Sequence, residues 1–373
     1  MKITRVRIYR VTMPTTGGGF RRTTGFSPAE NTSAIVLVDT DEGITGAGEV
    51  CPLGRHYMPG VFTEGAFAGL PVLAGMVLGA DPFQTEKINR EWDISFNGQN
   101  YIKTAIDMAL WDIMGQATGR PVCELLGGRW EKPVPLYRSV HLFAEHEDTP
   151  EMWAKRCIDY RHQGYRHFQL KCGSEPDHDI AKAQACCAIL EPGEKVLMDA
   201  NCGWTLHGAI RVAQGCRDLP VIIEQPCLTW EENIAFRRHC ALPVKLDESL
   251  HTTQDILRGF NEGAMDICCL KISRVGGLTK ARRIRDLCVD LGLQVTADDM
   301  WGSEIVTAAL AHFATSTPTK YVLNTTDLTD YVTTRTATGC PERQDGCITA
   351  STAPGLGVTP DMDVLGEPVA VVE

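Results

Sequence analysis

The stretch Val196-Leu197-Met198-Asp199 is a short apolar run that ends in a carboxylate, and it is one of five such runs in the second half of the chain. The other four end at Lys171, Glu224, Asp247 and Lys271, with 23 to 28 residues between successive end residues. That spacing is typical of strand–helix units, which form parallel sheets. Because the carboxyl ends of barrel strands converge on one mouth, the five charged residues are predicted to share a site.

The alternation of short apolar strands with amphipathic helices predicts an α/β barrel from about Pro133 onwards. Three further strands complete it, at Leu136–His141, Gln294–Asp298 and Tyr321–Asn324. Helices are expected between strands at 151–163, 179–190, 206–217, 278–291 and 304–315.

The first part of the chain has a different pattern, typical of an α+β domain. Alternating residues predict strands at Ile3–Val11, Ser33–Asp39 and Ile44–Glu49, and helical periodicity predicts a helix from Tyr101 to about Ala117. We therefore expect a capping domain at 1–128, a barrel at 129–345, and a tail at 346–373 that packs back on the cap.

Composition excludes several classes of function. The net charge of −11 argues against a nucleic-acid partner, and no apolar run reaches the roughly 20 residues of a membrane span. The N-terminal residues alternate like a strand and do not resemble a signal peptide. Cys186-Cys187 and Cys268-Cys269 are adjacent pairs within apparent core elements, which indicates reduced thiols. We expect a cytoplasmic homo-oligomer.

Five motifs follow one another along the predicted strand ends: Gln169-Leu170-Lys171, Asp199-Ala200-Asn201, Glu224-Gln225-Pro226, Asp247-Glu248-Ser249 and Lys271-Ile272-Ser273-Arg274. Through them the whole chain resembles the enolase superfamily, in particular its branch of muconate-lactonizing and mandelate-racemase-like enzymes. The resemblance implies a (β/α)7β modified TIM barrel under an N-terminal α+β capping domain. That branch usually carries Lys-x-Lys on the second strand; here Gln169 replaces the first lysine and Lys171 is retained.

The three carboxylates suit a hard divalent cation. Removal of a proton next to a carboxylate creates negative charge, which a bound cation stabilises. Mg²⁺ prefers oxygen ligands, so Asp199, Glu224 and Asp247 are its predicted ligands. Carboxylates at strand ends also cap helices, which would account for one of the three but not for the evenly spaced set.

Lys171 and Lys271 are the predicted catalytic groups, on strands that face each other across the barrel. Two bases on opposite sides of an α-carbon can remove a proton from one face and return it to the other. A racemase or epimerase, an isomerase, is therefore the first hypothesis. In the alternatives, a lysine holds the substrate carboxylate, or the pair supports loss of a β-substituent, as in a hydroxyproline dehydratase, another lyase or a cycloisomerase.

Other polar residues near the strand ends have two interpretations each. Asn201 either bonds a metal-bound water or caps the helix that begins near Thr205. Asp298 and Asp299 are substrate-binding or supporting groups, or else they pair with nearby cations. His141 is interpreted as a polar core residue.

The expected substrate is a small-molecule carboxylate. The segments around Tyr57 and Trp301, with Gln169, resemble those of 4-hydroxyproline betaine 2-epimerases, which implies proline betaine or its 4-hydroxy derivative as substrate. Aromatic rings can hold a quaternary ammonium through cation–π attraction. Alternatively Trp301 packs at a helix start and Tyr57 belongs to a lid. A non-catalytic barrel that kept a metal site is the third hypothesis, disfavoured by the intact lysines.

Overall fold

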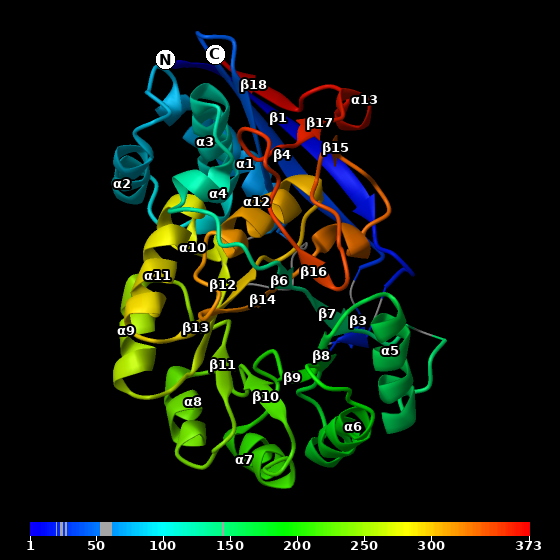
Figure 1. Ribbon diagram of the computed structural model, residues 1–373. Helices are drawn as coiled ribbons and strands as arrows, with labels where there is room; N and C mark the ends of the chain where they lie inside the picture. The colour runs from blue at the N-terminus through cyan, green and yellow to red at the C-terminus, as the bar shows by residue number, and fades with distance from the viewer. Residues whose placement is uncertain (20, 23–24, 27, 53–61, 144) are drawn as a thin grey trace.

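The computed structural model describes residues 1–373 except 20, 23–24, 27, 53–61 and 144. Its first part is an antiparallel sheet in the order β18-β1-β4-β5. The strands are β1 (Ile3–Pro14), β4 (Glu30–Thr40), β5 (Thr45–Val50) and β18 (Ala370–Val372), and the short strands β2 (Arg21–Arg22) and β3 (Gly25–Phe26) form a separate pair. Both chain ends therefore lie in the cap, at the top of Figure 1.

Helices α1 (Thr63–Val77), α2 (Thr85–Ser95) and α3 (Asn100–Thr118) complete the cap, and α4 (Val122–Leu125) follows. Helix α3 packs directly on β5, and this close approach requires glycine. A Cβ at Gly48 would lie 1.8 Å from the carbonyl oxygen of Ala105. Helix α3 ends at Gly119, whose φ of +66° is the left-handed conformation that glycine adopts without strain.

Eight parallel strands form the barrel, in sequential order from β7 to β14. They are β7 (Tyr137–Val140), β8 (His167–Lys171), β9 (Lys195–Asp199), β10 (Val221–Glu224), β11 (Val244–Leu246), β12 (Ile267–Lys271), β13 (Gln294–Asp298) and β14 (Val322–Thr325). A parallel bridge between Leu136 and Thr325 joins the two edges. The predicted fold class is confirmed.

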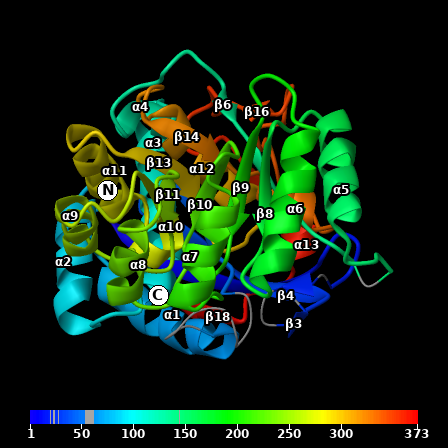
Figure 2. The same ribbon diagram turned by 90° about the horizontal axis from the view of Figure 1, so that it is seen from below.

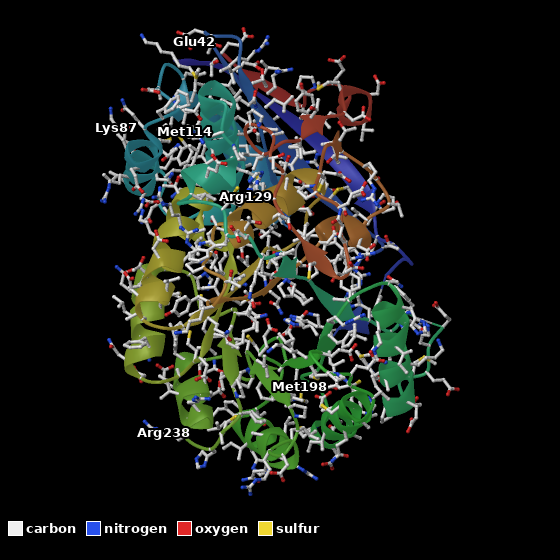
Figure 3. The ribbon with its side chains drawn as sticks, in the orientation of Figure 1. Glu42, Lys87, Met114, Arg129, Met198 and Arg238 are labelled. Carbon is white, nitrogen blue, oxygen red and sulfur yellow. The ribbon has the colours of Figure 1, made fainter. Side chains whose placement is uncertain are left out.

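Helices cover the outside of the barrel, as the view from below shows (Figure 2). They are α5 (Pro150–His162), α6 (Pro176–Ala188), α7 (Leu206–Gly215), α8 (Trp230–Arg237), α9 (Thr253–Asn261), α11 (Leu278–Asp290) and α12 (Glu304–Thr315), with the short α10 (Ile272–Val275) after β12. Helices α8 and α9 were not predicted. In Figure 3, Met198 marks the buried interior of β9, and Arg238 marks the exposed end of α8.

The C-terminal segment contacts both domains. Strand β16 (Cys347–Ile348) pairs with β6 (Val134–Pro135), and β15 (Ala337–Thr338) pairs with β17 (Thr359–Pro360). A 3-10 turn (Leu328–Tyr331) precedes these strands, and α13 (Met362–Leu365) follows them. Residue Leu356 donates its backbone N–H to Asp112 of α3 at 2.7 Å. The tail therefore also contacts helix α3 of the cap.

The state of the cysteines agrees with the expectation of reduced thiols, and the helices agree with the expectation that the chain has no membrane span. All fifteen cysteines are free, and eleven of them are buried. Within the described residues, the helices are too short or too polar to cross a membrane.

Candidate active site

The strand register brings the predicted groups to one mouth of the barrel. Lys171 is paired with Asp199, and Asp199 with Glu224, across β8, β9 and β10. Lys271 is paired with Asp298 across β12 and β13. Asp247 follows the last residue of β11. Because parallel strands end at the same level, all these side chains reach one region.

A pocket of about 610 Å³, part of it open to solvent, lies at this mouth. Its lining residues are Tyr137, Ser139, His141, Gln169, Lys171, Asp199, Asn201, Lys271, Asp298, Asp299, Met300, Trp301, Thr326, Leu328 and Tyr331. Eight of the candidate site residues from the sequence are among them. Glu224 and Asp247 are fully buried and do not line it. Tyr57 lies outside the described residues.

Each candidate catalytic lysine contacts carboxylates. Lys171 Nζ lies 2.6 Å from Asp199 Oδ2. Lys271 Nζ lies 2.7 Å from Asp247 Oδ2 and 2.9 Å from Asp298 Oδ2. Burial alone would lower the pKa of Lys271, but the two carboxylates raise it well above its ordinary value. Lys271 is therefore protonated in this arrangement.

Glu224 sits at the centre of the acidic cluster. Its carboxylate pairs with Lys245 Nζ at 2.9 Å and accepts a hydrogen bond from Gln169 Nε2 at 2.9 Å. Burial, together with the nearby charges of Asp199 and Asp247, raises the pKa of Glu224 to about 7, although Lys245 opposes the shift. Carboxylates that destabilise one another in this way would be stabilised by a bound cation.

The guanidinium of Arg274 binds Asp247. Arg274 belongs to the motif at the end of β12, but no role was predicted for it from the sequence. The guanidinium Nη1 lies 2.5 Å from Asp247 Oδ1 and 2.6 Å from its backbone oxygen. Burial would raise the pKa of Asp247, but Arg274 and Lys271 hold it well below its usual range. Asp247 is therefore an anion and a strong potential metal ligand.

Among the described residues, one group of three potential donor atoms within 4.8 Å of one another comes from Glu224, Asp247 and Cys269. Asp199 is not in that group, and its Oδ2 faces Lys171 instead. Burial raises the pKa of the Cys269 thiol well above 9, and Sγ lies 3.3 Å from Asp298 Oδ2. A neutral thiol is a poor ligand for Mg²⁺, which leaves the oxygen donors.

Asn201 does not cap the following helix, because Thr205 accepts the hydrogen bond from Gly208 there. Its side chain donates to Glu248 Oε1 at 3.1 Å, and its backbone N–H donates to Asp199 Oδ1 at 3.0 Å. Burial, with the charge of Asp247 beside it, raises the pKa of Glu248 to about 8. Asn201 thus orients two acids at the pocket.

Asp298 connects Lys271 of β12 to Tyr137 of β7. Its Oδ1 accepts from the Tyr137 hydroxyl at 2.8 Å and from the Asp299 backbone at 2.8 Å. Asp299 turns away to the Ser273 hydroxyl and to the Met300 backbone N–H, the latter at 2.7 Å. Burial raises the pKa of Asp299 to about 7.

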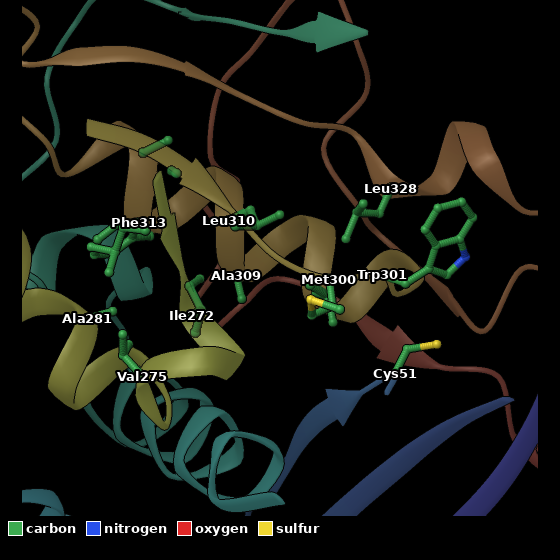
Figure 4. Packing of buried hydrophobic residues seen from close by; sticks show 14 of the residues in the cluster. Cys51, Ile272, Val275, Ala281, Met300, Trp301, Ala309, Leu310, Phe313 and Leu328 are labelled. Carbon is green, nitrogen blue, oxygen red and sulfur yellow. The ribbon is translucent and has the colours of Figure 1, made fainter. Parts of the chain in front are cut away.

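Trp301 belongs to an aromatic wall of the pocket. Its ring centroid lies 5.3 Å from that of Tyr331, with the planes 57° apart. Figure 4 shows Trp301 beyond Met300 and near Leu328, and all three line the pocket. Tyr331 also packs on Arg138, whose guanidinium carbon lies 3.8 Å from the ring centroid, and His141 meets the same ring edge-on.

Sequence reasoning missed Lys245 and gave no role to Tyr137 or Arg274. Lys245 had a usable signal, because it interrupts an apolar strand at a buried position between Val244 and Leu246. A lysine inside a buried strand requires an anionic partner.

Comparison with known families agrees with this geometry. The family described as enolase C-terminal domain-like matches residues 153–364, and the N-terminal domain of the mandelate racemase/muconate lactonizing enzymes matches residues 21–127. The chain belongs to the mandelate racemase/muconate lactonizing enzyme branch of the enolase superfamily.

Three similar proteins span nearly the whole of this superfamily member. A cis-3-hydroxy-L-proline dehydratase of Roseibium aggregatum is 44% identical, over 99% of both chains. An N-succinyl-L-Arg/Lys racemase of Bacillus cereus is 27% identical, over 98% of both. A solved enolase-superfamily structure from Roseovarius nubinhibens ISM, complexed with magnesium, has a TM-score of 0.93 and 36% identity, covering 100% of this chain and 99% of its own.

The expectation of an isomerase is wrong by this comparison. The 44% identical relative is a dehydratase, which is a lyase, whereas the racemase is far less similar at 27%. The physical reason is that both reactions begin with removal of an α-proton between two opposed groups. The opposed lysines therefore do not distinguish them.

Proposed function

We propose that this enolase-superfamily enzyme is a Mg²⁺-dependent dehydratase of a cyclic β-hydroxy amino acid such as cis-3-hydroxy-L-proline. The observation that carries the proposal is the 44% identity, over 99% of both chains, with a cis-3-hydroxy-L-proline dehydratase. The lysines on β8 and β12, four places apart among the eight strands, would supply the base and the acid. They approach the pocket from opposite sides, and a similar protein dehydrates this substrate.

The acidic cluster fits a magnesium ion. Glu224 and Asp247 have donor oxygens close together, and Asp199 stands beside Glu224 in register. These three carboxylates would hold the ion. When bound, it lowers the energy of the negative charge that develops on the substrate carboxylate as the α-proton leaves.

The stereochemistry of cis-3-hydroxy-L-proline suits opposed lysines. The hydroxyl and the carboxylate lie on one face of the ring, so the α-hydrogen lies on the other. Elimination of water is therefore anti, and it needs a base on one face and an acid on the opposite face. Lys171 and Lys271 meet that requirement.

The reaction balances with the groups present. One lysine, as the free amine, takes the proton from C2, and the C–H electron pair becomes the C2=C3 double bond. The C3–O bond breaks, and the other lysine, as the ammonium, gives its proton to the departing hydroxide, which leaves as water. The product is an enamine that tautomerises to a cyclic imine. Such proton transfers contribute typically 10²- to 10⁴-fold each.

The direct test is to incubate the purified protein with Mg²⁺ and cis-3-hydroxy-L-proline, and to follow water loss by mass spectrometry. We expect the product only with Mg²⁺ and not with Lys271→Ala. trans-4-Hydroxy-L-proline is the control, because its hydroxyl is not on the carbon next to Cα. Absence of water loss from the cis substrate at saturating Mg²⁺ would exclude the proposal.

We also propose a cytoplasmic location, which the fifteen free thiols support. The homo-oligomer stays a prediction.

A further inference from the structure

Ser139 offers a buried polar atom to the pocket. It lies on β7, is 6% exposed and lines the pocket. Its Oγ is buried without a hydrogen-bond partner among the described residues. Its backbone N–H donates to the Tyr331 hydroxyl at 3.0 Å, which fixes the strand at this point. A buried hydroxyl is stable only when a ligand or water satisfies it.

The barrel order places Ser139 on β7, two strands from Asp199 on β9 and four from β11, which Asp247 follows. The bridge between β14 and the start of β7 closes the ring. A substrate whose carboxylate meets the acids of β9 to β11 extends its ring towards β7 and β14. The ring would then lie beside the wall that contains Ser139, Trp301 and Tyr331.

The carboxylates near this wall already accept hydrogen bonds from the protein. Asp298 accepts from Tyr137, the Asp299 backbone, Lys271 and Cys269, which uses both of its oxygens. The carboxylate of Asp299 is bonded to Ser273 and to the Met300 backbone. A secondary ammonium has two N–H donors and requires an acceptor when it is buried.

We propose that Ser139 Oγ accepts a hydrogen bond from the ammonium of the bound cyclic amino acid. This assignment rests on the proposed function. It makes Ser139 a specificity-determining residue that selects a ring amine over a carbocycle. A lysine remains available to the leaving hydroxyl.

The test compares two carboxylates of the same shape, L-proline and cyclopentanecarboxylate, as ligands of the Mg²⁺-loaded protein by titration calorimetry. Neither can be dehydrated, so the measurement does not depend on turnover. We expect wild type to prefer proline, and Ser139→Ala to bind proline roughly 10- to 100-fold more weakly while binding cyclopentanecarboxylate unchanged. Ser174→Ala, exposed after β8, is the matched control and should match wild type for both ligands.

Two results would overturn the proposal. Equal weakening of both ligands in Ser139→Ala would mean that the hydroxyl only shapes the pocket. Wild type that binds the two ligands equally would mean that no amine subsite exists. Selective loss of proline binding, combined with failure to dehydrate cis-3-hydroxy-L-proline, would support the subsite and reject the proposed reaction.

Discussion

Lys271 and Asp298 are paired residues at the ends of neighbouring strands, and Lys271 Nζ donates to Asp298 Oδ2 at 2.9 Å. The same carboxylate is anchored by the Tyr137 hydroxyl from β7. Asp298 therefore positions the lysine and keeps an anion beside it. It does not need to touch the substrate to affect the reaction.

Replacing this anion should impair turnover. We expect Asp298→Asn to lower kcat by roughly 10- to 100-fold with little change in KM, a range typical of residues that orient an active-site group. Tyr137→Phe removes one anchor but keeps the charge, so its loss should be smaller. Steady-state kinetics check this, and an unchanged kcat in Asp298→Asn would show that Lys271 needs no such support.

The two lysines should be distinguishable by hydrogen exchange. We expect Lys171→Ala and Lys271→Ala each to lose dehydration by at least about 10²-fold. The variant that lacks only the acid should still exchange the α-hydrogen with D₂O, whereas the variant that lacks the base should not. Proton NMR reads the exchange, and full dehydration by either variant would remove that lysine from the mechanism.

Mg²⁺ binding should depend on the three carboxylates and not on the Cys269 thiol. We expect Asp199→Asn, Glu224→Gln and Asp247→Asn each to weaken Mg²⁺ binding at least about 10-fold in a calorimetric titration, because Mg²⁺ requires hard oxygen ligands. Cys269→Ser tests the alternative donor and should bind Mg²⁺ as wild type does. A strong loss in Cys269→Ser with none in Asp199→Asn would replace one ligand by the other.

We expect Asp112 to make the free energy of unfolding depend on pH. This residue lies in helix α3 of the cap, remote from the active site. Burial raises its pKa to about 6, although backbone N–H groups of Leu356 and Ala47 donate to it. A folded pKa above the unfolded value of roughly 3.9 stabilises the fold at low pH, and this contribution is lost as pH rises through about 6.

The expected size of that loss is about 3 kcal/mol, from a shift of about two units at 1.36 kcal/mol each. Urea unfolding of wild type and Asp112→Asn at several values between pH 4 and pH 7 measures it. The free energy of unfolding of wild type should fall relative to the variant as pH rises. A constant difference would show that Asp112 has the same pKa in both states.

Much of the barrel was predictable because the six strands β8 to β13 are short runs that end at, or directly before, a charged residue. The predicted bounds of β13 and α12 match those observed. Helices α8 and α9 were not predicted because they are short and bury few apolar side chains. Their capping boxes, Thr229 with Glu232 and Thr252 with Asp255, were nevertheless readable in the sequence.

Most residues of the site could be predicted from the sequence, but the contacts between their side chains could not. Strand ends identify Lys171 and Lys271. They do not show that Glu224 pairs with Lys245, which lies beside it on the neighbouring strand β11. The type of reaction could not be predicted from the site residues, because an isomerase and a dehydratase share the first step. They differ in whether the substrate carries a leaving group, which no residue of the chain encodes alone.

Anti elimination between the opposed lysines can be tested by comparing cis- and trans-3-hydroxy-L-proline, each deuterated at C2, in one assay. In the trans isomer the hydroxyl and the α-hydrogen share a face, so the two lysines cannot act on them from opposite sides. We expect water loss with loss of deuterium from the cis isomer, and a kcat/KM at least about 10²-fold lower for the trans isomer. Equal dehydration of both isomers, or loss of deuterium from the cis isomer without loss of water, would contradict it.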